Sequence, residues 1–218
     1  MTSPTCAPPA PPRRWHCSAG TGPVRAISPA APRYNRAHAV LGASPACAAV
    51  YPGDLAVALV ALDAVVDTVG AAGKRSLPVA ALHLAPGDTP QRETVLEGDE
   101  LIVRIRLPRS AAARRSTYHK VRDRESFAFA LASAAVALEI GGGRVRDVRI
   151  ALGGVATRPW RASQAERSLV GASLTRASAR RAAELAFADA RPLSHNAFKV
   201  ALGVETVTDA LLLARDRS

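Results

Sequence analysis

Strand-like segments come first in this chain and helical segments come last, and this order constrains the fold most. Before residue 157, most short runs either alternate apolar and polar side chains or are continuously apolar, and a run at 53–66 has helical spacing. After "RPWRA", at 158–162, three runs have apolar residues at helical spacing and capping residues near their starts. Runs of strands followed by runs of helices are typical of α+β folds. We therefore predict an α+β protein.

Three neighbouring segments in the second half of the chain predict an antiparallel sheet. "STYHKVRDR", at 116–124, and "RVRDVRIALGGV", at 144–155, have strand-like patterns. The run between them, "SFAFALASAAVALEI" at 126–140, is almost uncharged and fits either a strand or a helix. "GGG" at 141–143 is typical of a hairpin turn. The sequence therefore predicts a three-stranded antiparallel sheet followed by a helical bundle.

The first half of the chain predicts further helix and strand elements. In "GDLAVALVALDAVV", Asp54 is placed to cap a helix. "AVVDTVG" at 64–70 predicts a strand, and "AAGK" at 71–74 predicts a turn. "ELIVRIRLP" at 100–108 predicts another strand with one apolar side. The residues on that side are Leu101, Val103, Ile105 and Leu107.

The composition argues against several classes of protein. A net charge of +11 would suit a nucleic-acid binder, but basic and acidic residues are interleaved through the body of the chain. Neither an RNA-binding aromatic motif nor a helix-turn-helix pattern is present, so we predict no nucleic-acid partner. No apolar run approaches the roughly 18 residues of a membrane helix, so we predict no membrane insertion.

The first 34 residues differ in composition from the rest. They are rich in Pro, Ala and Arg and lack periodicity, which predicts a disordered segment at 1–34. The chain has three cysteines, Cys6, Cys17 and Cys47, and an odd, sparse set does not predict a disulfide framework.

Lys120 and Asp54 are the candidate site residues that the pattern itself suggests. Lys120 lies on a predicted strand among other cations, where it could bind a phosphate or a reduced flavin. The alternative is a solvated strand face, which the pattern alone favours. Asp54 could accept a hydrogen bond from a ribityl or ribose hydroxyl, but a simple N-cap is favoured on sequence.

Several segments taken together resemble a known family. They are "YPGDLAVALVALDAVV", "YHKVRDRESFAFALASAAVALE" and "VRIALGGVATRPWRA", with "NRAHAVLGASPAC" and "HNAFKVAL" in addition. They resemble the FAD-binding subunit of the xanthine dehydrogenase family of molybdenum hydroxylases, most closely the flavin subunit of periplasmic-type aldehyde oxidoreductases. The resemblance covers residues 35–216. It implies an oxidoreductase subunit in which FAD passes electrons from iron–sulfur clusters to an external acceptor.

The resemblance also implies partners and a domain organisation. A large subunit would carry the molybdenum cofactor that oxidises an aldehyde or xanthine, and a small subunit would carry [2Fe–2S] clusters. Residues 35–92 would be a remnant of the FAD-binding subdomain. Residues 93–218 would be a carbon monoxide dehydrogenase flavoprotein C-terminal domain. We expect no signal peptide in this chain, and a location in the periplasm through a partner's signal, or in the cytoplasm.

Four residues match the family's cofactor contacts. Asp54 matches the aspartate that follows the second glycine loop, Lys120 the lysine near the isoalloxazine, and Ile102 an apolar residue beside the ring. Cys47 matches the last of four cysteines that bind a [4Fe–4S] cluster in the aldehyde oxidoreductase group, so the cysteine set here is incomplete.

The sequence also departs from the family. The glycine loops "GGTNL" and "TxAGN", whose backbone N–H groups hold the FAD phosphates, do not occur. Their loss should remove most of the affinity for FAD. The alternative function is therefore a truncated, non-catalytic docking protein that has lost FAD. The loss of likeness before Asn35 suggests a truncated or frame-shifted gene product, which upstream genomic sequence encoding the missing loops would support.

Overall fold

The structure, a computed structural model, describes residues 34–217, so the predicted disorder at 1–34 falls almost wholly outside the described residues. The fold class is α+β, as predicted, with two antiparallel sheets and several helices. In chain order the elements are α1 (Leu55–Ala61), β1 (Val65–Gly70), β2 (Gly73–Pro78), α2 (Val79–Leu82), β3 (Leu101–Arg106), the 3-10 turn η1 (Ala112–Arg114), β4 (Arg115–Val121), β5 (Ala132–Gly141), β6 (Arg144–Gly153), β7 (Trp160–Arg161), α3 (Ser163–Leu169), α4 (Arg176–Ala186) and α5 (Phe198–Asp216).

The larger sheet has the strand order β4-β5-β6-β7, and every neighbouring pair is antiparallel. Its first three strands are the predicted meander, and the short β7 is an addition that the sequence pattern did not show. The uncharged run at 126–140 becomes a strand only from Ala132 onward. Gly142 and Gly143, with φ of 61° and 73°, form the predicted hairpin turn, since left-handed backbone favours glycine.

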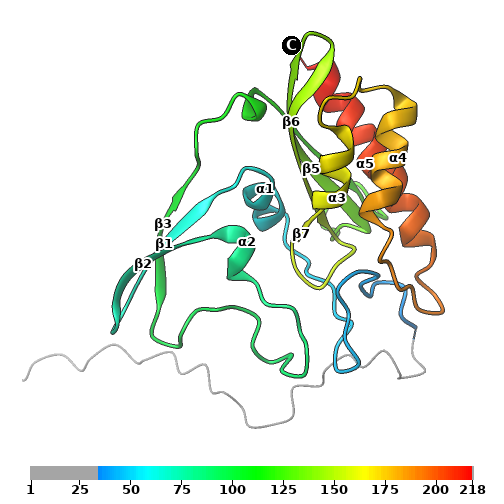
Figure 1. Cartoon of the computed structure of the whole chain (residues 1–218). Helices are drawn as coiled ribbons and strands as arrows, with labels where there is room; N and C mark the ends of the chain where they lie inside the picture. Colours follow the sequence, from blue (N-terminus) through cyan, green and yellow to red (C-terminus); the bar gives the residue numbers. More distant parts are fainter. Residues whose placement is uncertain (1–33, 218) are drawn as a thin grey trace, which may run out of the picture.

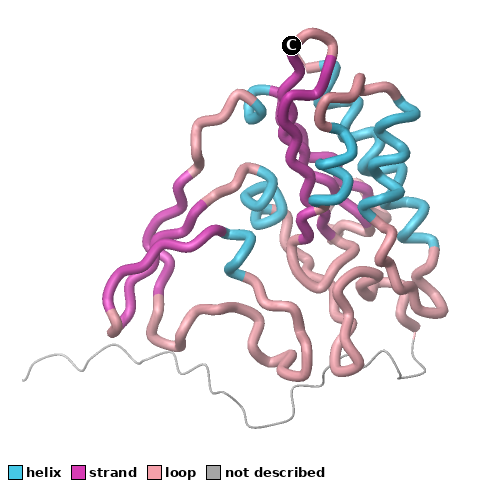
Figure 2. Tube along the Cα trace, viewed as in Figure 1, coloured by secondary structure: helices cyan, strands magenta, loops and turns pink. Residues whose placement is uncertain are grey.

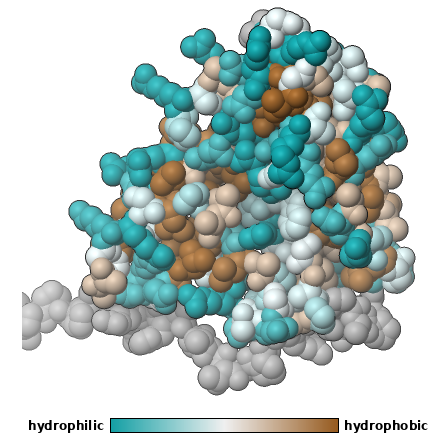
Figure 3. All heavy atoms as spheres, viewed as in Figure 1, coloured by the Kyte–Doolittle hydropathy of each residue, from teal (hydrophilic) through white to brown (hydrophobic). Residues whose placement is uncertain are grey.

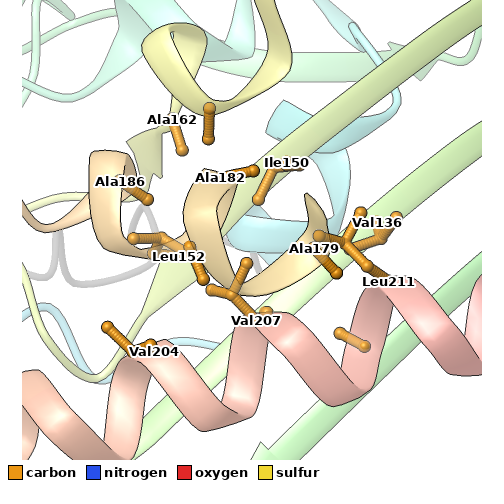
Figure 4. Close-up of a cluster of buried hydrophobic side chains, with 14 of the residues drawn as sticks. Val136, Ile150, Leu152, Ala162, Ala179, Ala182, Ala186, Val204, Val207 and Leu211 are labelled. Carbon is orange, nitrogen blue, oxygen red and sulfur yellow. The ribbon is translucent and has the colours of Figure 1, made fainter. Parts of the chain in front are cut away.

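Helices α3, α4 and α5 cover one face of the larger sheet (Figure 1). Val136 and Ile150 on the strands meet Val207 and Leu211 on α5 in a single apolar cluster (Figure 4). The buried side of α4 is lined by alanines, which let this short helix lie close to its neighbours. Gly203 on α5 serves the same purpose, because a Cβ there would lie 2.1 Å from the Phe187 ring.

Helix α1 lies against the opposite face of the larger sheet. Val57 on α1 belongs to a second apolar cluster with Ala135 of β5 and Ala151 of β6. The same cluster takes in Val66 of β1 and Leu77 of β2, so it joins the larger sheet to the smaller one. The larger sheet is therefore covered on both faces.

The smaller sheet has the order β2-β1-β3, and a loop at 83–100 connects α2 to β3 (Figure 2). The strand predicted at 64–70, the turn after it and the strand at 100–108 are all present. All six residues of β3 are exposed, however, so the apolar side predicted for this strand is not a buried face. Strand β3 lies at the edge of its sheet, where few described residues pack on it.

Because β3 pairs with β1, the two sheets divide between β3 and β4 rather than at residue 93. The division of the chain into domains at 35–92 and 93–218 stays a prediction. Within residues 34–217, no helix is both long enough and apolar enough to cross a membrane.

Candidate functional site

Asp54 sits at the start of α1 but does not cap it with its side chain. The residue occupies the N-cap position with helical backbone angles, and no side-chain cap hydrogen bond forms. One carboxylate oxygen accepts from the Tyr118 hydroxyl at 2.7 Å, and the other accepts from the Lys120 ammonium at 2.6 Å. The simple N-cap favoured on sequence is therefore wrong, because two donors on β4 take the carboxylate instead.

Strand β4 presents Tyr118 and Lys120 on the same side. Residues two apart on a strand point to the same face, and here that face meets the start of α1. The Tyr118 hydroxyl also lies 3.0 Å from the hydroxyl of Ser133 on β5. A phenol carries one proton, so Tyr118 donates to Asp54 and accepts from Ser133. The sequence pattern did not single out Tyr118 or Ser133, although Tyr118 lies two positions before Lys120 on the strand.

A glycine on β6 keeps room for this cluster. Gly153 pairs with Ser133 across the sheet. A Cβ on Gly153 would lie 2.6 Å from the Ser133 hydroxyl and 2.8 Å from the Val57 side chain. The next residue, Gly154, has φ of 71°, and its carbonyl accepts from the Lys199 ammonium at 2.8 Å. The backbone behind the site is thus fixed from the helical side of the sheet.

The electrostatics of the cluster fix its protonation. Partial burial opposes ionisation of Asp54, but hydrogen bonds from Lys120 and Tyr118, with the charges of Lys120 and Arg122, outweigh it and lower its pKa. Burial raises the pKa of Tyr118. At neutral pH the site therefore holds a carboxylate, a neutral phenol and nearby cations. The Asp54 side chain is 45% exposed and that of Lys120 18%, so a ligand can reach both.

The structure brings together two of the three predicted FAD contacts. Asp54 and Lys120 form an ion pair across 66 positions of sequence. Ile102 lies on β3, which belongs to the smaller sheet, whereas Lys120 lies on β4 of the larger one. The Ile102 residue is 36% exposed. The assignment of all three residues to FAD stays a prediction.

Cys47 lies in a short turn, and its surroundings do not fit an iron–sulfur cluster. Its sulfur accepts from the backbone N–H of Ala49 at 3.4 Å. Among residues 34–217, no group of three or more His, Cys, Asp or Glu side chains could hold a metal ion. Cys6 and Cys17 fall outside the described residues. A [4Fe–4S] cluster needs four thiolates, so the described residues do not supply its ligands.

Two protein families match the chain in succession. The family described as "FAD binding domain in molybdopterin dehydrogenase" matches residues 17–110, beginning before the resemblance seen from Asn35. The family described as "CO dehydrogenase flavoprotein C-terminal domain" matches residues 116–214. Asp54 lies in the first match, and Tyr118 and Lys120 lie in the second. The Asp54–Lys120 ion pair therefore joins the two matched regions.

Curated relatives and solved structures agree with these matches. The chain is 42% identical over 183 residues to the aldehyde oxidoreductase FAD-binding subunit PaoB of Escherichia coli (strain K12), covering 84% of this chain and 54% of that subunit. It is 31% identical over 121 residues to the glyceraldehyde dehydrogenase medium chain of Sulfolobus acidocaldarius, covering 56% of this chain and 41% of that one.

Among solved structures, CO dehydrogenase from Oligotropha carboxidovorans has a TM-score of 0.67 at 25% identity, covering 76% of this chain and 57% of that one. Quinoline 2-oxidoreductase from Pseudomonas putida 86 has a TM-score of 0.63 at 28% identity, covering 83% of this chain and 59% of that one. The chain spans about half the length of the curated relatives it matches. It belongs to the FAD-binding medium subunits of the molybdenum hydroxylase family.

Proposed function

We propose that this chain forms the flavin-contacting part of the FAD-binding subunit of an aldehyde-oxidising molybdenum hydroxylase. In this assembly, a large subunit with the molybdenum cofactor oxidises the substrate, and a small subunit with [2Fe–2S] clusters passes electrons to FAD. The main support is the ion pair between Asp54 and Lys120, which connects the two regions matched to flavoprotein families.

The donor set of the cluster suits a flavin. The Asp54 carboxylate can accept a hydrogen bond from a ribityl or ribose hydroxyl. The Lys120 ammonium can donate to a ring carbonyl, and its charge favours a reduced, anionic flavin over the neutral oxidised form. FAD, when bound, supplies the transfer of electrons from the clusters to an external acceptor.

The remaining residues of the cluster prepare it for a ligand. Tyr118 holds Asp54 in place and stays protonated, so it adds no second negative charge beside the carboxylate. Ser133 fixes the phenol from the neighbouring strand. The Lys120 ammonium has three N–H donors and uses one of them in its hydrogen bond to Asp54, so two remain for a ligand.

The two missing glycine loops set the expected strength of binding. Without these two loops as a source of backbone donors for the phosphates, this chain should hold the flavin end of FAD more firmly than the adenine end. Weak binding that depends on the isoalloxazine and ribityl groups is therefore expected. A chain that binds no flavin would correspond to the alternative, a non-catalytic docking protein.

Flavin binding tests the proposal directly. The full chain is titrated with FAD and separately with riboflavin, and flavin fluorescence and visible absorbance are followed, alone and after co-expression with candidate partner subunits. Lys120→Ala should abolish the signal. The matched control is Lys74→Ala, since Lys74 is an exposed lysine on β2. Absence of flavin under every condition, or an equal loss in both variants, would count against the proposal.

A further inference from the structure

Asp63 occupies the position just after α1 at which a glycine often ends a helix. Its φ is 51°, in the left-handed region that glycine adopts most readily. The backbone N–H of Asp63 donates to the carbonyl of Val60 at 3.3 Å, and that of Ala64 donates to the carbonyl of Leu59 at 2.9 Å. These two bonds form a Schellman motif, in which glycine is the usual residue at this position. The backbone here therefore does not favour an aspartate.

The charge of Asp63 is also unfavourable at this place. Carbonyl groups at the C-terminal end of a helix carry partial negative charge, which repels a carboxylate. Two arginines offset this cost, since Arg161 donates to one carboxylate oxygen at 2.6 Å and Arg149 donates to the other. Arg161 also donates to the Val60 carbonyl of α1 at 3.1 Å. The guanidiniums thus hold the end of α1 through both a side chain and the backbone.

Both arginines belong to the larger sheet. Arg149 lies two residues before Ala151 on β6, and Arg161 on β7 pairs directly with Ala151. Since Ala151 packs in the apolar cluster of α1, all three side chains face the helix. Arg161 also donates to Glu166 on α3, and this carboxylate accepts from the backbone N–H of Ile150 at 2.7 Å. We call Asp63, Arg149 and Arg161 the α1 clamp.

The α1 clamp differs from an ordinary surface ion pair. Exposed ion pairs contribute little to stability, and Figure 3 shows hydrophilic residues over much of the face that it draws. The side chains of Arg149 and Arg161 are only 23% and 24% exposed. They meet Asp63 across 86 and 98 positions of sequence. The clamp therefore fixes α1 on the sheet at the cost of an unfavourable residue at the helix end.

The other end of α1 carries the proposed flavin site. Asp54 directly precedes the helix, and its carboxylate accepts from Tyr118 and Lys120 on β4. The helix has seven residues and lies between the two sheets (Figure 1). At about 1.5 Å per residue, its two ends are only about 10 Å apart. A shift of α1 along the sheet would therefore move Asp54 relative to both of its donors.

We propose that Asp63, held by Arg149 and Arg161, is a positioning residue for the Asp54–Lys120 site, because it sets where α1 lies on the larger sheet. The consequence for flavin rests on the proposed function. The consequence for Asp54 does not, because the environment of its carboxylate can be measured in the free chain.

Two substitutions of Asp63 in the full chain test this inference. Asp63→Asn removes the charge and keeps a residue that tolerates left-handed backbone. Asp63→Gly removes the side chain and relieves the backbone, so it should keep the fold even where the clamp adds stability. The matched control is Glu205→Gln, since Glu205 also pairs with two arginines and its side chain is 43% exposed, as is that of Asp63. Circular dichroism confirms that the variants are folded.

The pKa of Asp54 is the main readout. Burial opposes ionisation of Asp54, but hydrogen bonds from Lys120 and Tyr118 outweigh it and lower the pKa. Both Asp63 variants should raise this pKa in an NMR titration of the carboxyl carbon, because the displaced carboxylate loses donors. Loss of the negative charge of Asp63 acts alone in the opposite direction, since it makes Asp54 easier to ionise. The sign of the change therefore separates displacement from a direct effect of charge.

Riboflavin binding is the second readout. Both Asp63 variants should bind riboflavin at least about threefold more weakly than the unmodified chain, and Glu205→Gln should bind it equally well. If the unmodified chain binds no flavin, the proposed function fails, and the pKa of Asp54 alone decides the inference.

Three results would overturn the inference. The first is a pKa of Asp54 that stays the same or falls in either Asp63 variant. The second is an equal rise of that pKa in Glu205→Gln. The third is an unchanged affinity of both Asp63 variants for riboflavin when the unmodified chain binds it.

Discussion

The two sheets of this protein share an antiparallel topology but differ in how they are covered. Strand β5 has seven successive buried residues, from Ala132 to Leu138, because helices lie on both of its faces. Strand β3 has six successive exposed residues. The difference lies in the neighbouring layers: α3, α4 and α5 on one side and α1 on the other protect the larger sheet (Figure 1). Coverage, rather than strand pattern, decides which apolar side chains contribute to stability.

Replacing one leucine by alanine in each sheet region should give the largest difference in the free energy of unfolding. Leu211 on α5 is fully buried against the larger sheet, and Leu101 on β3 is 67% exposed. Leu211→Ala should reduce the free energy of unfolding by about 2–5 kcal/mol. Leu101→Ala should change it by about 0.5 kcal/mol or less. Denaturant unfolding of both variants measures the difference, and equal losses would mean that β3 is covered in the isolated chain.

The same contrast explains which features the sequence could predict. Element types followed from local spacing, so the strands at 64–70 and 100–108 and the change to helices after residue 162 were predictable. Exposure of Ile105 was not, because its alternation is the same whether or not another layer covers the strand. The point at which the uncharged run at 126–140 becomes a strand was not predictable either, since Phe127 and Phe129 near its start fit a buried strand but are 95% and 74% exposed in a loop.

The candidate site was predictable only in part, because its contacts cross the fold. Lys120 and Asp54 each stood out locally, but their pairing joins residues 66 positions apart. Family resemblance selected both residues without showing the contact. The roles of Tyr118 and Ser133 depend on strand register, which only the paired sheet defines.

Lys199 should make the larger sheet sensitive to alkaline pH. Its ammonium is buried and donates to three backbone carbonyls, those of Ala37, His38 and Gly154. Burial lowers the pKa of Lys199 from 10.5 to about 8. Between these values the unfolded chain binds more protons than the folded one, so the free energy of unfolding rises with pH. The total rise should be about 3 kcal/mol, since one pKa unit corresponds to about 1.4 kcal/mol.

Unfolding in denaturant from pH 7.5 to 10.5 tests this prediction. Lys199→Met cannot titrate, so its free energy of unfolding should rise less steeply with pH than that of the unmodified chain. Lys74→Met, on the exposed sheet, should keep the slope of the unmodified chain. Identical slopes in all three proteins would show that Lys199 is not buried as a cation.

Removing the Tyr118 hydroxyl should have a moderate effect where the larger sheet meets α1. Tyr118→Phe keeps the ring but leaves Asp54 and Ser133 each without one partner, which should cost about 1–3 kcal/mol of unfolding free energy. The pKa of Asp54 should rise, because one of the hydrogen bonds that lower it is lost. NMR titration of the carboxyl carbon measures the second effect, and an unchanged pKa would show that Lys120 alone holds Asp54.

Acid should affect the smaller sheet, with the smallest change of the four. Hydrogen bonds from Arg75 and Thr68 lower the pKa of Glu100 to about 2, from 4.5. A lowered carboxyl pKa contributes stability that is present above pH 4.5 and is lost as pH falls towards 2. The effect should be weak and salt-sensitive because the Arg75 side chain is 47% exposed. Glu100→Gln should reduce the loss of unfolding free energy at acid pH, and it should leave the rise at alkaline pH that Lys199 causes unchanged.

The two sheets would then respond at opposite ends of the pH range. The larger sheet responds through a cation that burial disfavours, and the smaller sheet responds through a carboxylate that surface arginines favour. If Glu100→Gln loses as much unfolding free energy at acid pH as the unmodified chain, that loss would be assigned to Asp67 instead. Hydrogen bonds from Arg106, Ser76 and Arg104 also lower the pKa of Asp67.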